Sequence, residues 1–171
     1  MKKNIYRVLS GAAVVLCLWV IFGFSAQPAE TSLSSSGGVI KVIARLFNSE
    51  FDTLSAEAQA EIVGMWQNFV RKTAHFCEYA LLGFLSANAL CTYRLSRPLK
   101  WVIPIGFCVV AAAFDEFHQT FVEGRGGRAS DVLLDSLGVV FGVVCFALLF
   151  WIIKKIKEKG ANTKNDTKVN A

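Results

Sequence analysis

The apolar residues of this chain are gathered in long blocks, and these blocks constrain the fold more than any other feature. Residues 8–24 contain no charged residue, and the only charged residue in 133–150 is Asp135. The hydrocarbon core of a membrane is about 30 Å thick and is crossed by roughly 20 helical residues, so each block can form a spanning helix. The charged fraction is 18%, below the ~25% that is typical of soluble domains. A soluble enzyme is therefore the less favoured class.

Two further apolar blocks can cross the membrane only if polar residues enter it. Residues 73–93 contain His75 and Glu78. Residues 101–114 would form a helix of only about 21 Å, so that helix must continue to residue 121 in order to span. We therefore expect an all-α multi-pass membrane protein with a four-helix transmembrane bundle and short amphipathic extracytoplasmic helices. The predicted spanning helices lie at about residues 5–25, 73–93, 99–121 and 131–153.

The basic residues support this topology, because Lys and Arg beside short loops collect on the cytoplasmic side. If both termini are cytoplasmic, twelve of the 18 basic residues lie inside with only two of the 13 acidic residues. The inside then carries +10 and the outside −5, in agreement with the net charge of +5. We expect a cell-membrane protein with cytoplasmic N- and C-termini. Since the charge follows topology, no nucleic-acid partner is expected.

The two ends of the chain invite separate interpretations. Residues 1–153 are expected to form the membrane domain, and the basic residues 154–171 a disordered cytoplasmic tail near anionic lipid headgroups. The basic start and the first apolar block also fit a signal sequence that is cleaved near residues 23–25. A retained first helix is the favoured interpretation.

Residues 26–72 are expected to lie outside the membrane. The Ser-Ser-Ser-Gly-Gly stretch at residues 34–38 predicts a flexible hinge. Apolar residues then recur at helical spacing over residues 39–47, and a second amphipathic helix is expected after Ser55, a favourable N-cap residue. These helices could lie in the headgroup plane or could pack on the bundle as a cap, and both possibilities stay open.

Ionisable residues inside membrane helices are rare and usually face the bundle interior or a cavity. Arg71, His75 and Glu78 are four and three residues apart and so share one helix face. Glu78, Asp115 and Asp135 each lie one to two turns inside the outer boundary of a predicted span. The sequence therefore predicts a polar cluster in the outer third of the membrane.

The last predicted helix carries a stripe of two acids followed by two glycines. Asp131, Asp135, Gly138 and Gly142 recur at helical spacing. Glycines at this spacing allow helices to pack closely in a membrane. We expect this stripe to face the other helices.

The loop at residues 123–131 joins the last two predicted helices and contains Gly-Arg-Gly-Gly-Arg. Arg125 and Arg128 stand just before a helix N-terminus, which suits a phosphate or carboxylate. A tight turn whose arginines pair with Asp115, Glu116 or Asp131 has the same sequence. Both interpretations stay open.

The same polar residues bear on metal binding and catalysis. His75 with Glu78, and the Asp-Glu-Phe-His stretch at residues 115–118, offer nitrogen and oxygen ligands from two helices. Buried ion pairs are the commoner explanation, so no metal and no cofactor is expected. No serine stands in a nucleophile-elbow context. The five cysteines are odd in number and contain no Cys-x-x-Cys pair, so we expect them to be small apolar fillers.

Three stretches resemble the VanZ-like family of membrane proteins. They are Phe-Ser-Ala-Gln-Pro at residues 24–28, Arg-Lys-Thr-Ala-His-Phe-Cys-Glu-Tyr at 71–79, and Asp-Glu-Phe-His-Gln-Thr-Phe at 115–121. The resemblance covers roughly residues 15–150. Ser136 is one departure, since family members often carry asparagine near this position. Further matching residues are Leu82, Gly83, Gly124, Arg125, Arg128, Asp131, Val132, Asp135 and Gly138.

The resemblance implies a multi-pass bacterial membrane protein whose namesake is associated with low-level resistance to teicoplanin. We expect an envelope protein that binds or alters an anionic envelope component at the outer leaflet and lowers susceptibility to glycopeptide or lipopeptide antibiotics. The partner would be a membrane lipid or a cell-wall precursor that bears an anionic group. The expected anion ligands are Arg71, Lys72, Arg125 and Arg128. The expected supporting residues are His75, Glu78, Asp115, Glu116, His118, Gln119, Asp131 and Asp135.

Two alternatives use the same residues differently. The first is a membrane hydrolase or transferase that acts on a phosphate-bearing lipid or wall intermediate, with His75 or His118 as general base or nucleophile. It is less favoured, because the sequence has no recognised phosphatase or nucleotide-binding motif. The second is that the polar residues only fix the register of the helices. The candidate catalytic residues are His75, Glu78, Asp115, His118 and Asp135.

Overall fold

The computed structural model describes the backbone of residues 2–169 and the side chains of residues 3–28 and 37–160. That part of the chain contains helices and no strand, so the predicted all-α class is confirmed. The elements are α1 (Lys2–Ser25), α2 (Ala29–Phe47), the 3-10 helix η1 (Phe51–Thr53), α3 (Ala56–Cys91), α4 (Leu99–Gln119) and α5 (Ala129–Val169).

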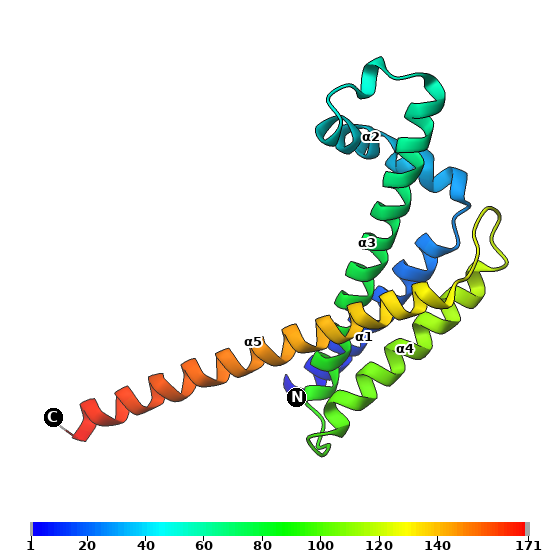
Figure 1. The fold of residues 1–171 in the computed structure, drawn as a ribbon. Helices are drawn as coiled ribbons and strands as arrows, with labels where there is room; N and C mark the ends of the chain where they lie inside the picture. Colours follow the sequence, from blue (N-terminus) through cyan, green and yellow to red (C-terminus); the bar gives the residue numbers. More distant parts are fainter. Residues whose placement is uncertain (1, 170–171) are drawn as a thin grey trace.

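Helix α3 is the central element, and it packs against α1, α2, α4 and α5 (Figure 1). The start of α1 and the α3–α4 connection lie at one end of the bundle, and the α4–α5 loop lies at the other (Figure 1). Ile21, Tyr79, Cys108 and Val139 come from four different helices and are fully buried in the core. All five cysteines are free thiols, as expected for residues that do not form a disulfide framework.

Glycines bring α3 and α5 into close contact where they cross. A side-chain carbon added to Gly138 would collide with the carbonyl of Phe76, and one added to Gly142 would collide with that of Ala80. Gly83 lies against the backbone of Val139 in the same way from the α3 side. The predicted close-packing role of the glycine stripe is therefore confirmed, and this crossing turns the acidic end of α5 toward α3.

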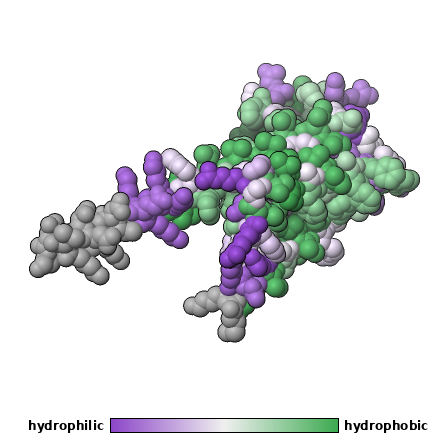
Figure 2. Space-filling model, turned by 90° about the horizontal axis from the view of Figure 1, so that it is seen from below, coloured by the Kyte–Doolittle hydropathy of each residue, from purple (hydrophilic) through white to green (hydrophobic). Residues whose placement is uncertain are grey.

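Two helices, residues 3–25 and 129–160, are long and apolar enough to cross a membrane. Only 17% and 28% of their apolar windows are buried inside the structure, which is little for the core helix of a soluble protein. Within the described residues α3 and α4 do not meet this criterion. Figure 2 shows apolar side chains over most of the visible face of the bundle, with hydrophilic groups on the projecting part of α5. These features and the exposed Trp19, Val110 and Leu133 are those of a membrane protein.

The segment that we expected outside the membrane is more continuous than predicted. Ser55 caps a helix as expected, since its hydroxyl accepts a hydrogen bond from the Ala58 N–H at 3.3 Å. The helix that begins there, however, is α3 itself, so the separate amphipathic helix and the 73–93 span are one element. No proline or glycine interrupts residues 65–82, and nothing therefore ends the helix between them.

The predicted hinge at residues 34–38 is wrong for the backbone, because α2 runs through it without a break. Serine and glycine each disfavour a helix by less than about 1 kcal/mol relative to alanine. Ile40 and Ala44 on the following turns are fully buried, and α2 packs against α3. Burial of this apolar face outweighs the low helix propensity of the hinge residues.

Helix α5 also continues beyond residue 153, to Val169, where we predicted a disordered tail. Lysine and glutamate are good helix formers. The Lys154 ammonium lies 3.7 Å from the Glu158 carboxylate one turn later, and the Lys155 ammonium lies 4.5 Å from the centre of the Trp151 ring. The tail is therefore helical up to Val169, and residues 170–171 lie outside the described part.

Candidate functional site

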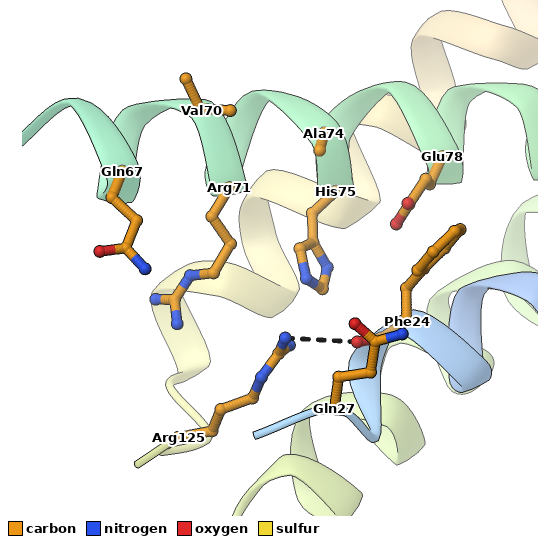
Figure 3. Close-up of a pocket in the computed structure, with 9 residues that line it drawn as sticks. All are labelled: Phe24, Gln27, Gln67, Val70, Arg71, Ala74, His75, Glu78 and Arg125. Atoms are coloured by element: carbon orange, nitrogen blue, oxygen red, sulfur yellow. Dashed lines mark hydrogen bonds between the residues drawn. The ribbon is translucent and has the colours of Figure 1, made fainter. Parts of the chain in front are cut away.

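A cavity of about 230 Å³ opens between the end of α1, the middle of α3 and the α4–α5 loop. The α3 residues that line it are three or four positions apart, so they lie on one helix face. Figure 3 shows the polar side chains of this face, Arg71, His75 and Glu78 among them, directed toward the end of α1 and the loop. The lining residues are Phe24, Gln27, Gln67, Val70, Arg71, Ala74, His75, Glu78 and Arg125.

Arg71 and Arg125 point into the same space from α3 and from the α4–α5 loop (Figure 3). Arg125 donates a hydrogen bond to the Phe24 carbonyl at 3.2 Å, and its buried Nε has no partner among the described residues. Among the described residues, Arg71 makes one hydrogen bond, a long contact of 3.4 Å with the Asn68 side chain. Neither guanidinium forms an ion pair with a described carboxylate.

The electrostatic environment of Arg125 combines burial with nearby charges of both signs. Burial lowers the pKa of the Arg125 guanidinium and the positive charge of Arg71 lowers it further, whereas the carboxylates of Asp115, Glu116 and Glu78 raise it. An arginine nevertheless keeps its proton in proteins. Two like charges that face one partly buried cavity are stabilised when an anion enters between them.

The glycines of the α4–α5 loop shape this end of the site. Gly124 has a φ of 71°, in the left-handed region that favours glycine. A side-chain carbon on Gly127 would collide with the Glu116 carbonyl, so the loop packs directly on the end of α4. There the Arg128 backbone N–H donates to Glu116 Oε2 at 3.0 Å. The Gly-Arg-Gly-Gly-Arg loop is thus a tight turn that also aims Arg125 into the cavity.

Two of the predicted anion ligands have other positions. The Lys72 ammonium lies 2.7 Å from Asp131 Oδ1, and this ion pair joins α3 to the first turn of α5. Ser130 also donates to Asp131 Oδ1, at 3.3 Å. The Arg128 side chain is exposed and does not line the cavity. Of the four predicted ligands, Arg71 and Arg125 therefore come together, and Lys72 and Arg128 do not join them.

The polar side chains at the end of α4 contact α1 and one another. Asp115 is fully buried and accepts a hydrogen bond from the Ser25 hydroxyl of α1 at 3.0 Å. Gln119 donates to Asp115 at 3.2 Å and to Glu116 at 3.1 Å, and so holds the two carboxylates in place. His118 faces α1 instead, with its ring centre 6.4 Å from that of Phe22.

Glu116 meets two predicted residues from other helices. Its carboxylate, the His75 imidazole and the Asp135 carboxylate each offer a ligand atom, and these atoms lie within 4.8 Å of one another. His75 Nδ1 is 3.8 Å from Asp135 Oδ2. Glu78, in contrast, lies one turn farther along α3, near Phe24 (Figure 3). The polar residues therefore form two adjoining groups. One lines the arginine cavity, the other contains Glu116 and Asp135, and His75 belongs to both.

The prediction missed three polar residues in or beside the site, Ser25, Gln27 and Gln67. Ser25 and Gln27 stand directly after the first apolar block, where polar side chains at the end of a span could have been noticed. Gln67 precedes Arg71 by four residues, which places both on one helix face. The helical spacing was the signal for Gln67.

The comparison with known families assigns the chain to a family. Residues 11–151 match the VanZ/LLP1 family model, and that range includes both groups of the site. No curated protein and no solved structure matches the chain. Since the family model covers most of the sequence, this protein belongs to the VanZ/LLP1 family.

Proposed function

We propose that this protein binds the anionic group of a cell-envelope component, a membrane lipid or a cell-wall precursor, at the outer leaflet. The observation that carries the proposal is the pair Arg71 and Arg125, which face one cavity without a carboxylate partner among the described residues. Guanidinium groups bind phosphate and carboxylate through paired N–H donors. Gln27 and Gln67 add amide groups to the same cavity.

The size and lining of the cavity favour a headgroup rather than a whole precursor. Its volume of about 230 Å³ is below the roughly 300–1,000 Å³ of drug-sized ligand sites. Phe24, Val70 and Ala74 supply an apolar side to the cavity. A lipid phosphate matches both the charged and the apolar lining of the cavity. Its phosphate would lie at the arginines and its hydrocarbon chain along the apolar wall.

We also propose that α3 and α4 complete a four-span bundle with both termini in the cytoplasm. Helix α3 is surrounded by the other helices, so it does not need an apolar surface of its own. Helix α4 has 21 residues, about 31 Å of helix, and exposes Val102, Val110 and Phe114. The α3–α4 connection carries Arg94 and Arg97, which favours that end as cytoplasmic. The arginine cavity then lies at the outer side.

The contacts of α1 support its retention in the mature protein. Tyr6 donates to the Asn88 side chain at 2.6 Å, and Arg7 donates to the Thr92 carbonyl at 3.0 Å. At the other end of α1, Ser25 binds Asp115. Cleavage near residues 23–25 would remove one wall of the cavity.

In the proposed role, occupation of the cavity lowers susceptibility to glycopeptide or lipopeptide antibiotics. The test is to express the wild-type protein and an Arg71→Gln/Arg125→Gln variant in a susceptible host. The wild type should raise the inhibitory concentration of teicoplanin or a lipopeptide, and the double variant should not. Arg128→Gln is the matched control, because Arg128 is exposed and outside the cavity. Equal protection by the double variant at equal protein level would contradict the proposal.

A second candidate is a hydrolase or transferase that acts on a phosphate-bearing lipid. It is favoured by one observation, that His75 lines the arginine cavity and has Asp135 behind it at 3.8 Å. An imidazole can act as a general base, and a nearby carboxylate favours its protonated form. Purified protein would be incubated with polyprenyl phosphates, with and without divalent metal. Turnover that His75→Asn abolishes and His118→Asn spares would support this candidate, and no turnover in any condition would exclude it for these substrates.

A further inference from the structure

We propose that His75, Glu116 and Asp135 bind one divalent transition-metal ion, with Zn²⁺ as the best fit. This proposal replaces the expectation of no metal and is independent of the anion-binding function. The three residues come from α3, α4 and α5, so the ion would join three helices at one point.

The distances between the ligand atoms are close to those that a small ion requires. The three atoms lie within 4.8 Å of one another, and His75 Nδ1 is 3.8 Å from Asp135 Oδ2. Zinc–nitrogen and zinc–oxygen bonds of about 2.0–2.2 Å in a tetrahedral site place two ligand atoms roughly 3.3–3.6 Å apart. Small side-chain rotations are therefore enough to close the site around an ion.

Two members of this group, His75 and Asp135, have buried polar atoms without a hydrogen-bond partner among the described residues. The Asp135 side chain is only 1% exposed. Neither of its oxygens, nor His75 Nδ1, has a hydrogen-bond partner among the described residues. Buried carboxylates and imidazoles are normally paired, because burial without a partner is costly. One cation between them satisfies these atoms together.

The space at the group fits an ion and excludes an organic ligand. A cavity of about 10 Å³ lies there, which is the room that about one water-sized sphere occupies. Its walls come from α3, α4 and α5. The lining residues are Arg71, Lys72, His75, Glu116, Gln119, Asp131, Leu134 and Asp135.

The charges around the group leave its two carboxylates without a cation of their own. Lys72 is the nearest ammonium, and it is paired with Asp131 at 2.7 Å. Arg71 lines the small cavity but makes no ion pair with a described carboxylate. A divalent ion neutralises Glu116 and Asp135 at membrane depth, where unpaired charge is disfavoured.

Hydrogen bonds fix the orientation of the Glu116 carboxylate, as is common for carboxylates that bind metals. Gln119 Nε2 donates to Oε1 at 3.1 Å, and the Arg128 N–H donates to Oε2 at 3.0 Å. Each oxygen keeps a further lone pair for a metal. Supporting hydrogen bonds of this kind orient ligands and raise metal affinity. The close packing of Gly127 on α4 brings the Arg128 N–H to this carboxylate.

The donor set selects the class of metal. Mg²⁺ and Ca²⁺ prefer oxygen ligands alone. One imidazole nitrogen and two carboxylates suit Zn²⁺, with Mn²⁺ bound more weakly in the usual order of affinities. Three protein ligands also leave a fourth position open.

The test uses the full-length protein in detergent, stripped with a chelator and dialysed against Zn²⁺. Wild type should retain about one Zn²⁺ per chain by elemental analysis and should melt at a higher temperature with Zn²⁺ than without it. His75→Asn and Asp135→Asn should each lower the affinity by more than about 100-fold, since loss of a group that merely supports a ligand already costs 10- to 100-fold. The matched control His118→Asn should bind as wild type, because His118 faces Phe22 instead.

The wild-type result keeps the proposal falsifiable even if a variant fails to fold. Absence of retained Zn²⁺ in folded wild type would overturn it, and so would unchanged Zn²⁺ binding in folded Asp135→Asn. If Arg71 instead closes on Asp135, wild type binds no metal and Arg71→Gln lowers the melting temperature, which also overturns it. Lipid binding is not measured, so failure here is distinct from failure of the proposed function.

Discussion

Ser25 shows how a single hydroxyl can connect the first helix to the polar site. The Ser25 hydroxyl donates to Asp115 at 3.0 Å, and both side chains are almost fully buried. In the sequence, Asp115, Glu78 and Asp135 lie at similar depths in their predicted spans, and nothing distinguishes their expected partners. The structure gives each a different neighbour, because the rotation of each helix decides which acid meets which partner. Sequence spacing could predict the cluster but not these pairings.

Ser25→Ala should lower the stability of the bundle, since it removes a donor from a buried carboxylate. We expect a loss of about 1–3 kcal/mol in the free energy of unfolding. Thermal or denaturant unfolding in detergent measures it. Ser136→Ala is the control, because the Ser136 hydroxyl bonds only to the Val132 carbonyl of its own helix. Equal stability of Ser25→Ala and wild type would contradict a structural role for this contact.

At the scale of elements, the crossing of α3 and α5 positions both groups of the site. The glycine stripe on α5 was predictable, since small residues at helical spacing indicate close packing. The continuity of α3 from Ala56 to Cys91 was not predicted. The change from polar to apolar composition near residue 73 suggested a boundary. In the folded chain the same helix passes from the outer segment into the bundle without a break.

Gly142→Ala should separate α5 from α3, because the added carbon would collide with the Ala80 carbonyl. Overpacking of this kind typically costs about 1–3 kcal/mol, and the resistance of the purified protein to unfolding in sodium dodecyl sulfate measures it. Gly106→Ala provides the comparison, since no atom lies within 4 Å of a carbon added there. If both variants unfolded alike, the close crossing would be refuted.

At the scale of the whole molecule, the sequence predicted the helical class and the family correctly. Helix α5 alone has 41 residues, about 60 Å of helix, so its charged end projects beyond a bilayer. The arginine pair could be anticipated from residue type and depth. The separation of Lys72 and Arg128 from that pair could not, because it depends on the path of the α4–α5 loop. A loop path follows from tertiary packing rather than from local sequence.

The four-span topology predicts where reporter domains become active. Fusions after residues 96 and 160 should behave as cytoplasmic, and a fusion after Gly124 should behave as extracytoplasmic, because the basic residues hold the first two sites inside. Alkaline phosphatase and green fluorescent protein fusions measure the two sides. A cytoplasmic signal after Gly124 would refute the topology and move the arginine cavity to the inner leaflet.

The central claim is that Arg71 and Arg125 hold an anionic envelope component, and lipid mass spectrometry of gently purified protein tests it most directly. Wild type and Arg128→Gln should retain the same phosphate- or carboxylate-bearing lipid, and Arg71→Gln/Arg125→Gln should lose it. Identical lipid profiles for wild type and the folded double variant would contradict the claim.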